Sequence, residues 1–272
     1  MSTSIPNDTE TRFPPVSRFL VDQLEVRVYQ DRATLGAAAA ESAIKTLNDR
    51  RRNAQTSRVV FAAAPSQNEF LANLVADPSI DWSSVVAFHM DEYLGIKADH
   101  PASFRRYLNE RVFQRVPIPP QRVHLIVGES SAPNVAKTAL DYEMGLRESP
   151  IDLVFAGIGE NGHLAFNDPP VADFLDPLFV KVVRLDQACR IQQVNDGCFK
   201  TVDDVPAHAF TMTVPALLSA GTLTAAVPGE RKAQAVYAAL RGPIAETCPA
   251  SILRTHPRAR LYLDLDSARL VM

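Results

Sequence analysis

Few features of the 272-residue sequence point to a bound metal or to disulfide bonds. Its three cysteines, Cys189, Cys198 and Cys248, form no CxxC pair, and its six histidines show no HxH or HxxxH spacing. Such a sparse, odd set of cysteines is typical of proteins from a reducing compartment. We therefore expect no metal site, no disulfide framework and a cytoplasmic location.

Long apolar runs and an excess of positive charge are also missing. No stretch approaches the roughly 18 apolar residues of a membrane helix, and the first residues lack the basic-then-apolar order of a signal peptide. The formal net charge is −3, and the basic run 50–52 lies at the end of a predicted helix, where cations are favourable. These features predict neither a nucleic-acid nor a membrane partner.

Strand-like and helix-like segments alternate along the chain from residue 24. The predicted strands are 24–29, 58–63, 84–89, 123–127, 151–156, 180–184, 222–227 and 260–263. The predicted helices are 31–48, 69–74, 103–113, 132–147 and 230–240. This order predicts an α/β fold with a doubly wound, mostly parallel sheet flanked by helices. We expect residues 1–20 to form a loose arm and residues 21–272 a single domain.

Ligands of such folds bind outside the carboxyl ends of the strands. One such end carries Gly157-Ile-Gly-Glu-Asn-Gly162, which matches the G-x-G-x-x-G pattern of dinucleotide sites. That site requires a helix to open at the last glycine, and Pro169 and Pro170 forbid a long one. A nicotinamide oxidoreductase is thus a remote alternative, and we expect no cofactor. The glycines instead predict a tight turn that presents His163.

His163 lies among polar residues at a strand end, and imidazole is suited to proton transfer near neutral pH. Asp168 is a candidate for holding its ring. Asp91 and Glu92 follow another strand and point in different directions if the chain stays extended. One of them is a candidate carboxylate base and the other a cap of the next turn; the alternative is a solvated acidic pair.

Two cations are candidate ligands for an anion, although each is also compatible with an ordinary surface position. Lys232 lies in a predicted strand-to-helix turn, where amide groups and a lysine can hold a phosphate. Arg190 is the second.

Several segments, in this order along the chain, resemble the glucosamine-6-phosphate deaminase/isomerase family. They are Phe88-His-Met-Asp-Glu-Tyr-Leu-Gly95, His100-Pro-Ala-Ser-Phe104, Gly157-Ile-Gly-Glu-Asn-Gly-His-Leu-Ala-Phe-Asn-Asp-Pro169, Gly229-Glu-Arg-Lys-Ala233 and Pro249-Ala-Ser-Ile-Leu-Arg-Thr-His-Pro257. The resemblance covers roughly residues 24–265. It implies a modified Rossmann-like fold and the conversion of glucosamine 6-phosphate and water to fructose 6-phosphate and ammonia. A homo-oligomer is compatible with it, because the family commonly forms closed assemblies.

The resemblance also implies roles for individual residues. His163 matches the group that opens the sugar ring, and Asp91 matches the base that moves a proton from C2 to C1. Asp168 stands at the position of the histidine's partner, and Asn161, at a position where members have Asp or Asn, is a further candidate catalytic residue. Arg190 and Lys232 match the cations that bind the phosphate.

Two departures from the family pattern bear on the substrate. Asp168 stands where the family usually has Glu, which shortens the side chain by one methylene. Residues 63–67 read Ala-Ala-Pro-Ser-Gln where the family has a Thr-Gly-(Gly/Ser)-Thr-Pro phosphate loop. Proline removes an amide donor, and the absence of glycine restricts close approach of the backbone. Ser66 and Gln67 are the remaining candidate phosphate ligands.

These departures leave alternatives open. The protein could act by the same chemistry on a different sugar or sugar phosphate, or as a phosphogluconolactonase, or it could be a non-catalytic sugar-phosphate sensor. Residues 171–179 lack the pattern of the regulated deaminases, so we expect no allosteric control by an acetylated sugar.

Overall fold

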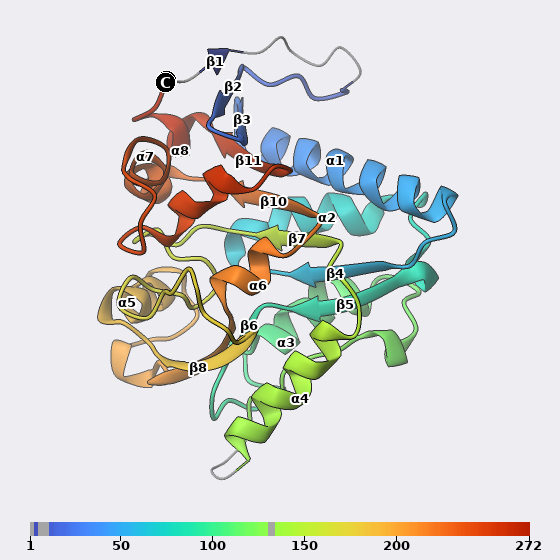
Figure 1. Cartoon of the computed structure of the whole chain (residues 1–272), viewed down its shortest axis with the longest axis vertical. Coiled ribbons are helices and arrows are strands. Elements are labelled where there is room, and N and C mark those ends of the chain that lie inside the picture. The colour runs from blue at the N-terminus through green and yellow to red at the C-terminus, as the bar shows by residue number, and fades with distance from the viewer. Residues whose placement is uncertain (1–2, 5–10, 130–133) are drawn as a thin grey trace.

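The computed structural model of the chain describes residues 3–4, 11–129 and 134–272 (Figure 1). The strands are β1 (Thr3–Ser4), β2 (Ser17–Val21), β3 (Leu24–Tyr29), β4 (Ser57–Phe61), β5 (Val85–His89), β6 (Asp91–Tyr93), β7 (Leu153–Ala156), β8 (Val180–Arg184), β9 (His208–Met212), β10 (Thr222–Val227) and β11 (Ala259–Asp264). The α-helices are α1 (Arg32–Arg52), α2 (Asn68–Ala76), α3 (Phe104–Leu108), α4 (Val135–Arg147), α5 (Gln187–Asn195), α6 (Val214–Leu218), α7 (Ala233–Arg241) and α8 (Leu265–Ala268). Short 3-10 or π turns connect several of them.

The main sheet has the strand order β1-β2-β3-β11-β10-β7-β4-β5 among the described residues. Strands β3, β11, β10, β7, β4 and β5 run parallel to one another. At the edge beyond β3, β2 pairs with β3 and β1 pairs with β2 in the antiparallel direction. The predicted α/β fold with a mostly parallel sheet flanked by helices is therefore confirmed.

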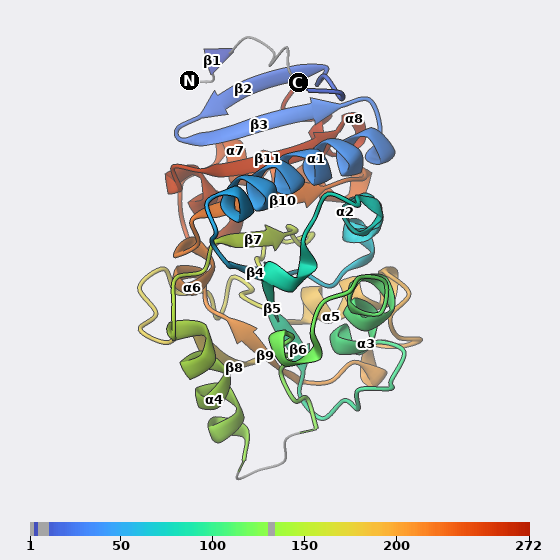
Figure 2. The same cartoon turned by 90° about the vertical axis from the view of Figure 1, so that its right-hand side faces the viewer.

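The two faces of the sheet are buried under different helices. Along β7, Leu153 and Phe155 belong to one apolar cluster and Val154 and Ala156 to the other, as the alternation of side chains along a strand requires. Helices α1 and α2 cover the first face, whereas α6 and α7 lie on the opposite face (Figures 1 and 2). No helix in the described part of the chain is long and apolar enough to cross a membrane.

Two details of the sequence prediction were wrong, and one correctly predicted strand belongs to a different sheet. Residues 17–20 of the arm predicted for 1–20 belong instead to β2, whose Phe19 and Val21 turn inward while it pairs with β3; residues 1–2 and 5–10 lie outside the described residues. The strand predicted at 180–184 is confirmed as β8, but it belongs to a second, antiparallel sheet with the order β6-β9-β8 among the described residues. Residues 123–127 make only one bridge, between Val123 and Ala87, and form no strand.

Side chains explain why no strand forms beside β5 at residues 123–127. The Nε2 atom of His89 accepts a hydrogen bond from the Ile126 amide at 2.7 Å. The hydroxyl of Tyr142 accepts from the His89 amide at 2.9 Å and lies 2.8 Å from the His89 carbonyl. These contacts satisfy polar groups at the edge of β5 that a neighbouring strand would otherwise pair.

Candidate active site

A cleft of about 390 Å³ opens at the carboxyl ends of β4, β5, β7 and β10. The loops after these four strands line it, as do residues of α5 and the N-terminal end of α1. Its size is in the range of small-molecule sites. The four predicted segments thus converge at one edge of the sheet, as expected for ligand sites of doubly wound folds.

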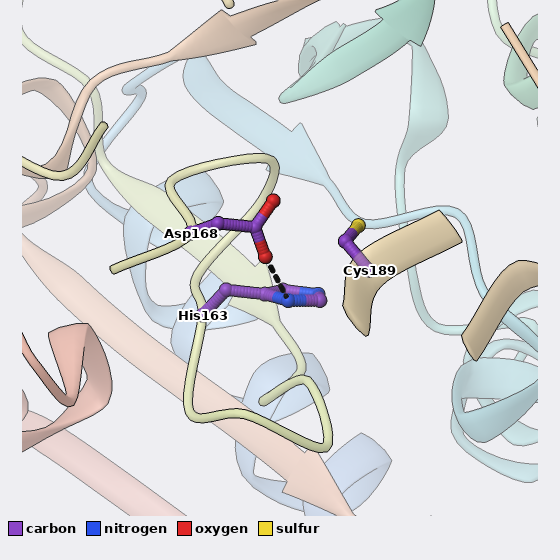
Figure 3. Close-up of side chains that lie close together, drawn as sticks. All are labelled: His163, Asp168 and Cys189. Carbon is purple, nitrogen blue, oxygen red and sulfur yellow. Dashed lines mark ion pairs between the residues drawn. The ribbon is translucent and has the colours of Figure 1, made fainter. Parts of the chain in front are cut away.

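His163 lies in the loop after β7, in contact with two polar partners. Its Nδ1 atom is 2.9 Å from Oδ1 of Asp168 and 2.8 Å from Oδ1 of Asn161 (Figure 3). Both partners at this nitrogen are acceptors, because the Asn161 amide nitrogen donates to Asp168 Oδ1 at 2.9 Å. We therefore assign the ring proton to Nδ1, which leaves the lone pair of a neutral ring on Nε2.

Asp168 is fully buried and lies behind His163. Burial by itself raises the pKa of this carboxyl, but the hydrogen bond and charge of His163, with the amide of Asn161, outweigh burial and lower it. Asp168 is therefore an anion that holds the imidazole through its Nδ1 atom. The shorter side chain at this position does not break the contact with the histidine.

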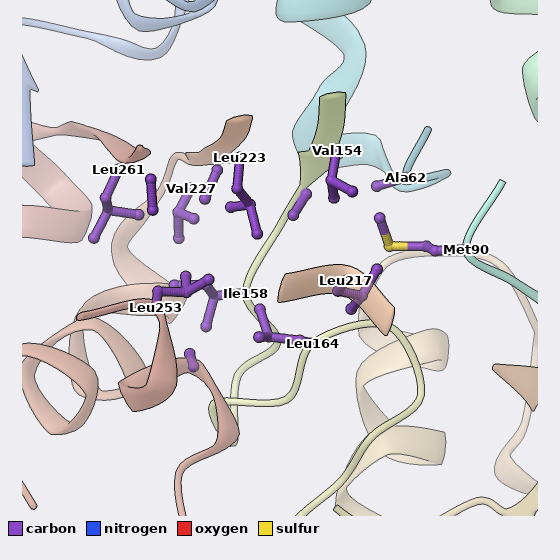
Figure 4. Packing of buried hydrophobic residues seen from close by; sticks show 14 of the residues in the cluster. Ala62, Met90, Val154, Ile158, Leu164, Leu217, Leu223, Val227, Leu253 and Leu261 are labelled. Carbon is purple, nitrogen blue, oxygen red and sulfur yellow. The ribbon is translucent and has the colours of Figure 1, made fainter. Parts of the chain in front are cut away.

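The backbone of the loop explains why glycine is required beside His163. A Cβ atom at Gly159 would lie 2.2 Å from two atoms of the imidazole ring, so only glycine leaves room for the ring. Gly162 has a φ of +86°, a conformation that side chains rarely adopt. The chain makes tight turns here and no helix, which excludes the dinucleotide geometry. Ile158 and Leu164 anchor the loop in the apolar cluster beneath it (Figure 4).

Asp91 and Glu92 have different environments, although they are adjacent in β6. Asp91 lines the cleft, is only 7% exposed, and no described residue donates a hydrogen bond to its carboxylate. Burial, and then the neighbouring charge of Glu92, raises the pKa of Asp91 well above its usual range. A buried carboxylate with a raised pKa at a cleft is suited to accept a proton.

Glu92 points away from the cleft and is fully buried. Its carboxylate accepts from the amides of Phe104 and Arg105, at 3.2 and 3.1 Å, at the start of α3. It also accepts from the Ser103 hydroxyl at 2.8 Å and from Nε of Arg105 at 3.1 Å. Glu92 therefore caps a helix, and the prediction that one acid faces the cleft while the other caps the next turn is confirmed.

Lys232 and Ser66 lie on the cleft wall formed by the loops after β10 and β4. Burial lowers the pKa of Lys232, while the nearby carboxylates of Asp196 and Glu160 oppose this. The Ser66 hydroxyl is 3.1 Å from the side-chain amide of Gln67, which donates to it. A lysine and a hydroxyl on one wall are suited to bind an anionic group.

Two of the predicted ligands lie outside the cleft, contrary to the prediction. Gln67 is 1% exposed, and its amide nitrogen donates to the Ala226 carbonyl at 3.0 Å, so it ties the β4 loop to β10. Arg190 faces the other side of α5, where it donates to the carbonyls of Val202 and Val205 at 2.5 and 3.2 Å. Its guanidinium braces the 3-10 turn at 202–204.

Several cleft residues were missed by the sequence reasoning. Arg231 lies 3.2 Å from Asp196 and 3.5 Å from Glu160, measured between side-chain nitrogen and oxygen atoms. Arg231 could have been predicted as a cleft residue from the sequence, because it is adjacent to Lys232. Nothing in the sequence pointed to Asp196, because it reaches the cleft only through the packing of the α5 segment.

Taken together, the fold and the site define an α/β enzyme with an acid–base centre at the carboxyl edge of its sheet. Residues 30–173, more than half of the chain, match the family described as glucosamine-6-phosphate isomerases/6-phosphogluconolactonase. The chain belongs to this family, and the resemblance seen in the sequence is confirmed.

Individual relatives agree with this assignment. The chain is 31% identical to glucosamine-6-phosphate deaminase of Listeria innocua, over 86% of this chain and 96% of the relative. It is 34% identical to the deaminase of an Exiguobacterium species, over 83% and 85% of the two chains. Among solved structures, a monomeric glucosamine-6-phosphate deaminase superposes with a TM-score of 0.82 at 28% identity, over 90% of this chain and 99% of that one.

The fold extends to the lactonases of the family. The 6-phosphogluconolactonase of Thermotoga maritima superposes with a TM-score of 0.72, over 88% of this chain and 98% of that one, at 18% identity. At this identity the likeness shows the shared fold alone.

Proposed function

We propose that the protein is a glucosamine-6-phosphate deaminase-type enzyme, which isomerises an amino-sugar phosphate from aldose to ketose and releases ammonia. The observation that carries the proposal is the placement of two different proton-transfer groups in one cleft. Asp91 is a buried carboxylate without a hydrogen-bond donor, and His163 is an imidazole with its proton held on Nδ1. The names of the relatives support the same activity.

In the proposed reaction, Nε2 of His163 takes the proton of the anomeric hydroxyl and returns it to the ring oxygen, which opens the sugar ring. Asp91 then removes the proton from C2 and delivers it to C1, so that the enolamine becomes an imine at C2. Water adds to the imine and ammonia leaves, which gives the ketose. The balance is one substrate and one water consumed, one ketose and one ammonia formed. Neither step needs a redox change.

The phosphate would lie against Lys232 and Ser66. In the loop after β4, the amides of Gln67 and Asn68 are already bonded to the carbonyls of Ala64 and Pro65, and Pro65 has no amide hydrogen. The loop therefore offers the amide and hydroxyl of Ser66, and Lys232 supplies the charge.

A second candidate is the same chemistry on a sugar without a phosphate. It is favoured by the ion pairs of Arg231 with Asp196 and Glu160, which place two carboxylates beside Lys232 and reduce the positive potential that a phosphate would meet.

An ammonia-release screen tests the proposal. Glucosamine, galactosamine and their 6-phosphates are incubated with the purified protein, and 6-phosphogluconolactone hydrolysis is measured in parallel. We expect ammonia from glucosamine 6-phosphate, at a rate that falls at least ~100-fold in Asp91→Asn. Ammonia only from unphosphorylated sugars would establish the second candidate. Lactone hydrolysis without ammonia release, or binding of sugar phosphates without turnover, would refute a deaminase.

A further inference from the structure

Behind the imidazole of His163, the structure brings together a nitrogen, an oxygen and a sulfur ligand. His163 and Asp168 come from the loop after β7, and Cys189 comes from α5, some twenty residues further along the chain. One potential ligand atom from each of the three residues lies within 4.8 Å of the other two. Figure 3 shows the Cys189 side chain next to the side chains of Asp168 and His163. The proposed deamination does not use this thiol.

The cluster is buried and incompletely satisfied. Asp168 and Cys189 are 0% and 1% exposed, and His163 is 7% exposed. Oδ1 of Asp168 contacts His163 and Asn161, and its buried Oδ2 atom has no nitrogen or oxygen donor in the described part of the chain; the Cys189 thiol is a further hydrogen-bond partner of this carboxylate. A thiol is only a weak donor, and a cation held between the carboxylate and the sulfur would take the place of the thiol proton and satisfy both buried groups.

We propose that His163, Asp168 and Cys189 bind a divalent metal ion of borderline or soft character, with Zn²⁺ and Cd²⁺ as its representatives. Thiolate, imidazole and carboxylate are the ligand types of zinc sites, and three protein ligands leave one position for water. Magnesium and calcium prefer sets of oxygen ligands, so a site with one carboxylate would discriminate against them.

Metal binding and proton transfer would exclude each other at this site. Nδ1 is the imidazole nitrogen beside Asp168, so coordination through it moves the ring proton to Nε2, and the thiol proton of Cys189 is released to the buffer. The lone pair that His163 needs for opening the sugar ring is then lost. We therefore expect the ion to inhibit turnover reversibly and not to support it.

The two other cysteines provide matched controls. Cys198 lines the same cleft but is not part of the cluster, and Cys248 contacts the loop at Gly162, where a Cβ atom would lie 2.7 Å from its sulfur. If any thiol in or near the cleft could bind the metal, replacing Cys198 or Cys248 would also weaken binding. If the cluster binds it, only the replacement of Cys189 has this effect.

The test is a titration of chelator-treated, reduced protein with Cd²⁺, followed by the thiolate-to-cadmium charge-transfer absorption, with competition by Zn²⁺ and Mg²⁺. We expect one equivalent to bind, Zn²⁺ to compete and Mg²⁺ not to compete. Cys189→Ala should abolish the absorption band and weaken Zn²⁺ binding at least ~10-fold, while Cys198→Ala and Cys248→Ala retain both.

Three results would overturn the proposal: no stoichiometric binding, a band that survives in Cys189→Ala, or a band lost in Cys198→Ala. If Cys189→Ala does not fold, Cys189→Ser replaces it in the titration, and cadmium-113 magnetic resonance of the unmodified protein tests whether sulfur is a ligand. A resonance characteristic of one sulfur with nitrogen and oxygen ligands supports the site, and one without sulfur refutes it. These readouts do not depend on which sugar the enzyme converts.

Discussion

The adjacent acids Asp91 and Glu92 permit a paired test of the structure. Each is changed to its own amide, so the two variants differ only in which carboxylate of β6 is neutralised. We expect Asp91→Asn to lose turnover and keep its stability, and Glu92→Gln to do the reverse. The contrast follows from their surroundings, because Asp91 faces the cleft with no donor while Glu92 accepts from several buried donors.

The magnitudes follow from these contacts. Oε2 of Glu92 accepts from the Ser103 hydroxyl and from both the amide and Nε of Arg105, so the NH₂ group of a glutamine would face donors on one side or the other. Removing one partner of a buried ion pair costs about 3–5 kcal/mol of unfolding free energy. Loss of a general base lowers kcat by about 100- to 10,000-fold.

The sign of the pH dependence is a separate check on Asp91. Burial raises its folded-state pKa above the unfolded value, so its contribution to stability is present at low pH and is lost as the pH rises through the folded-state pKa. Asp91→Asn removes that loss, about 1.4 kcal/mol for each unit of the pKa difference, and should be as stable as the parent or more so at neutral pH. Turnover of the parent should fall on the acid side at a higher pH than for an exposed carboxylate.

The free energy of unfolding is measured by urea titration and turnover by ammonia release, both on each variant. Glu92→Gln should keep its kcat within roughly tenfold per folded molecule. The reasoning is refuted if Asp91→Asn keeps its turnover, or if it loses as much stability as Glu92→Gln.

Three further predictions concern other parts of the chain. Gly159→Ala should lower kcat at least ~100-fold, because the new methyl group displaces the proposed proton-relay imidazole. The control Gly145→Ala has open space at its Cβ and should be active and ~0.5–1 kcal/mol more stable. Unchanged turnover in Gly159→Ala would contradict the geometry. Lys232→Met should raise KM for the sugar phosphate about 10- to 100-fold. Arg190→Met should leave KM unchanged and lower the melting temperature. An equal rise in KM in both variants would show that Arg190 binds the substrate. Burial lowers the pKa of His89 to about 3. The free energy of unfolding should therefore fall by up to about 1.4 kcal/mol per pH unit as the pH drops below about 6.5. Urea titrations that give the same free energy of unfolding at each pH in this range would disprove this.

Much of the fold was predictable, because strands buried on both faces carry continuous apolar runs with a characteristic spacing. The predicted strand 24–29 coincides with β3, and 222–227 coincides with β10. The pattern failed at 123–127. At 180–184 it predicted the strand correctly but not the sheet to which the strand belongs, because tertiary packing sets the backbone partners. At 123–127, His89 and Tyr142 take the place of a strand partner at the edge of β5.

The candidate site was predictable where chemistry and backbone coincide in one short segment. The turn that presents His163 needs its glycines locally, and Asp91 and Lys232 directly follow the strand ends that line the cleft. Gln67 and Arg190 also belong to such segments, but they face the protein interior and a neighbouring turn instead. The direction in which a side chain points depends on the packing of its segment, and composition does not reveal it.

The sequence by itself determined the class of fold and the family, and it pointed to Asp91 and His163 as candidate proton-transfer groups, because these depend on local periodicity and on residue types at strand ends. Only the tertiary structure decided which of Asp91 and Glu92 faces the cleft, and that Asp196 compensates the charge of Arg231. It alone brought Cys189 close to Asp168 and the imidazole of His163. Each of these features joins segments that are distant along the chain, and such distances are set by the packing of helices against the sheet.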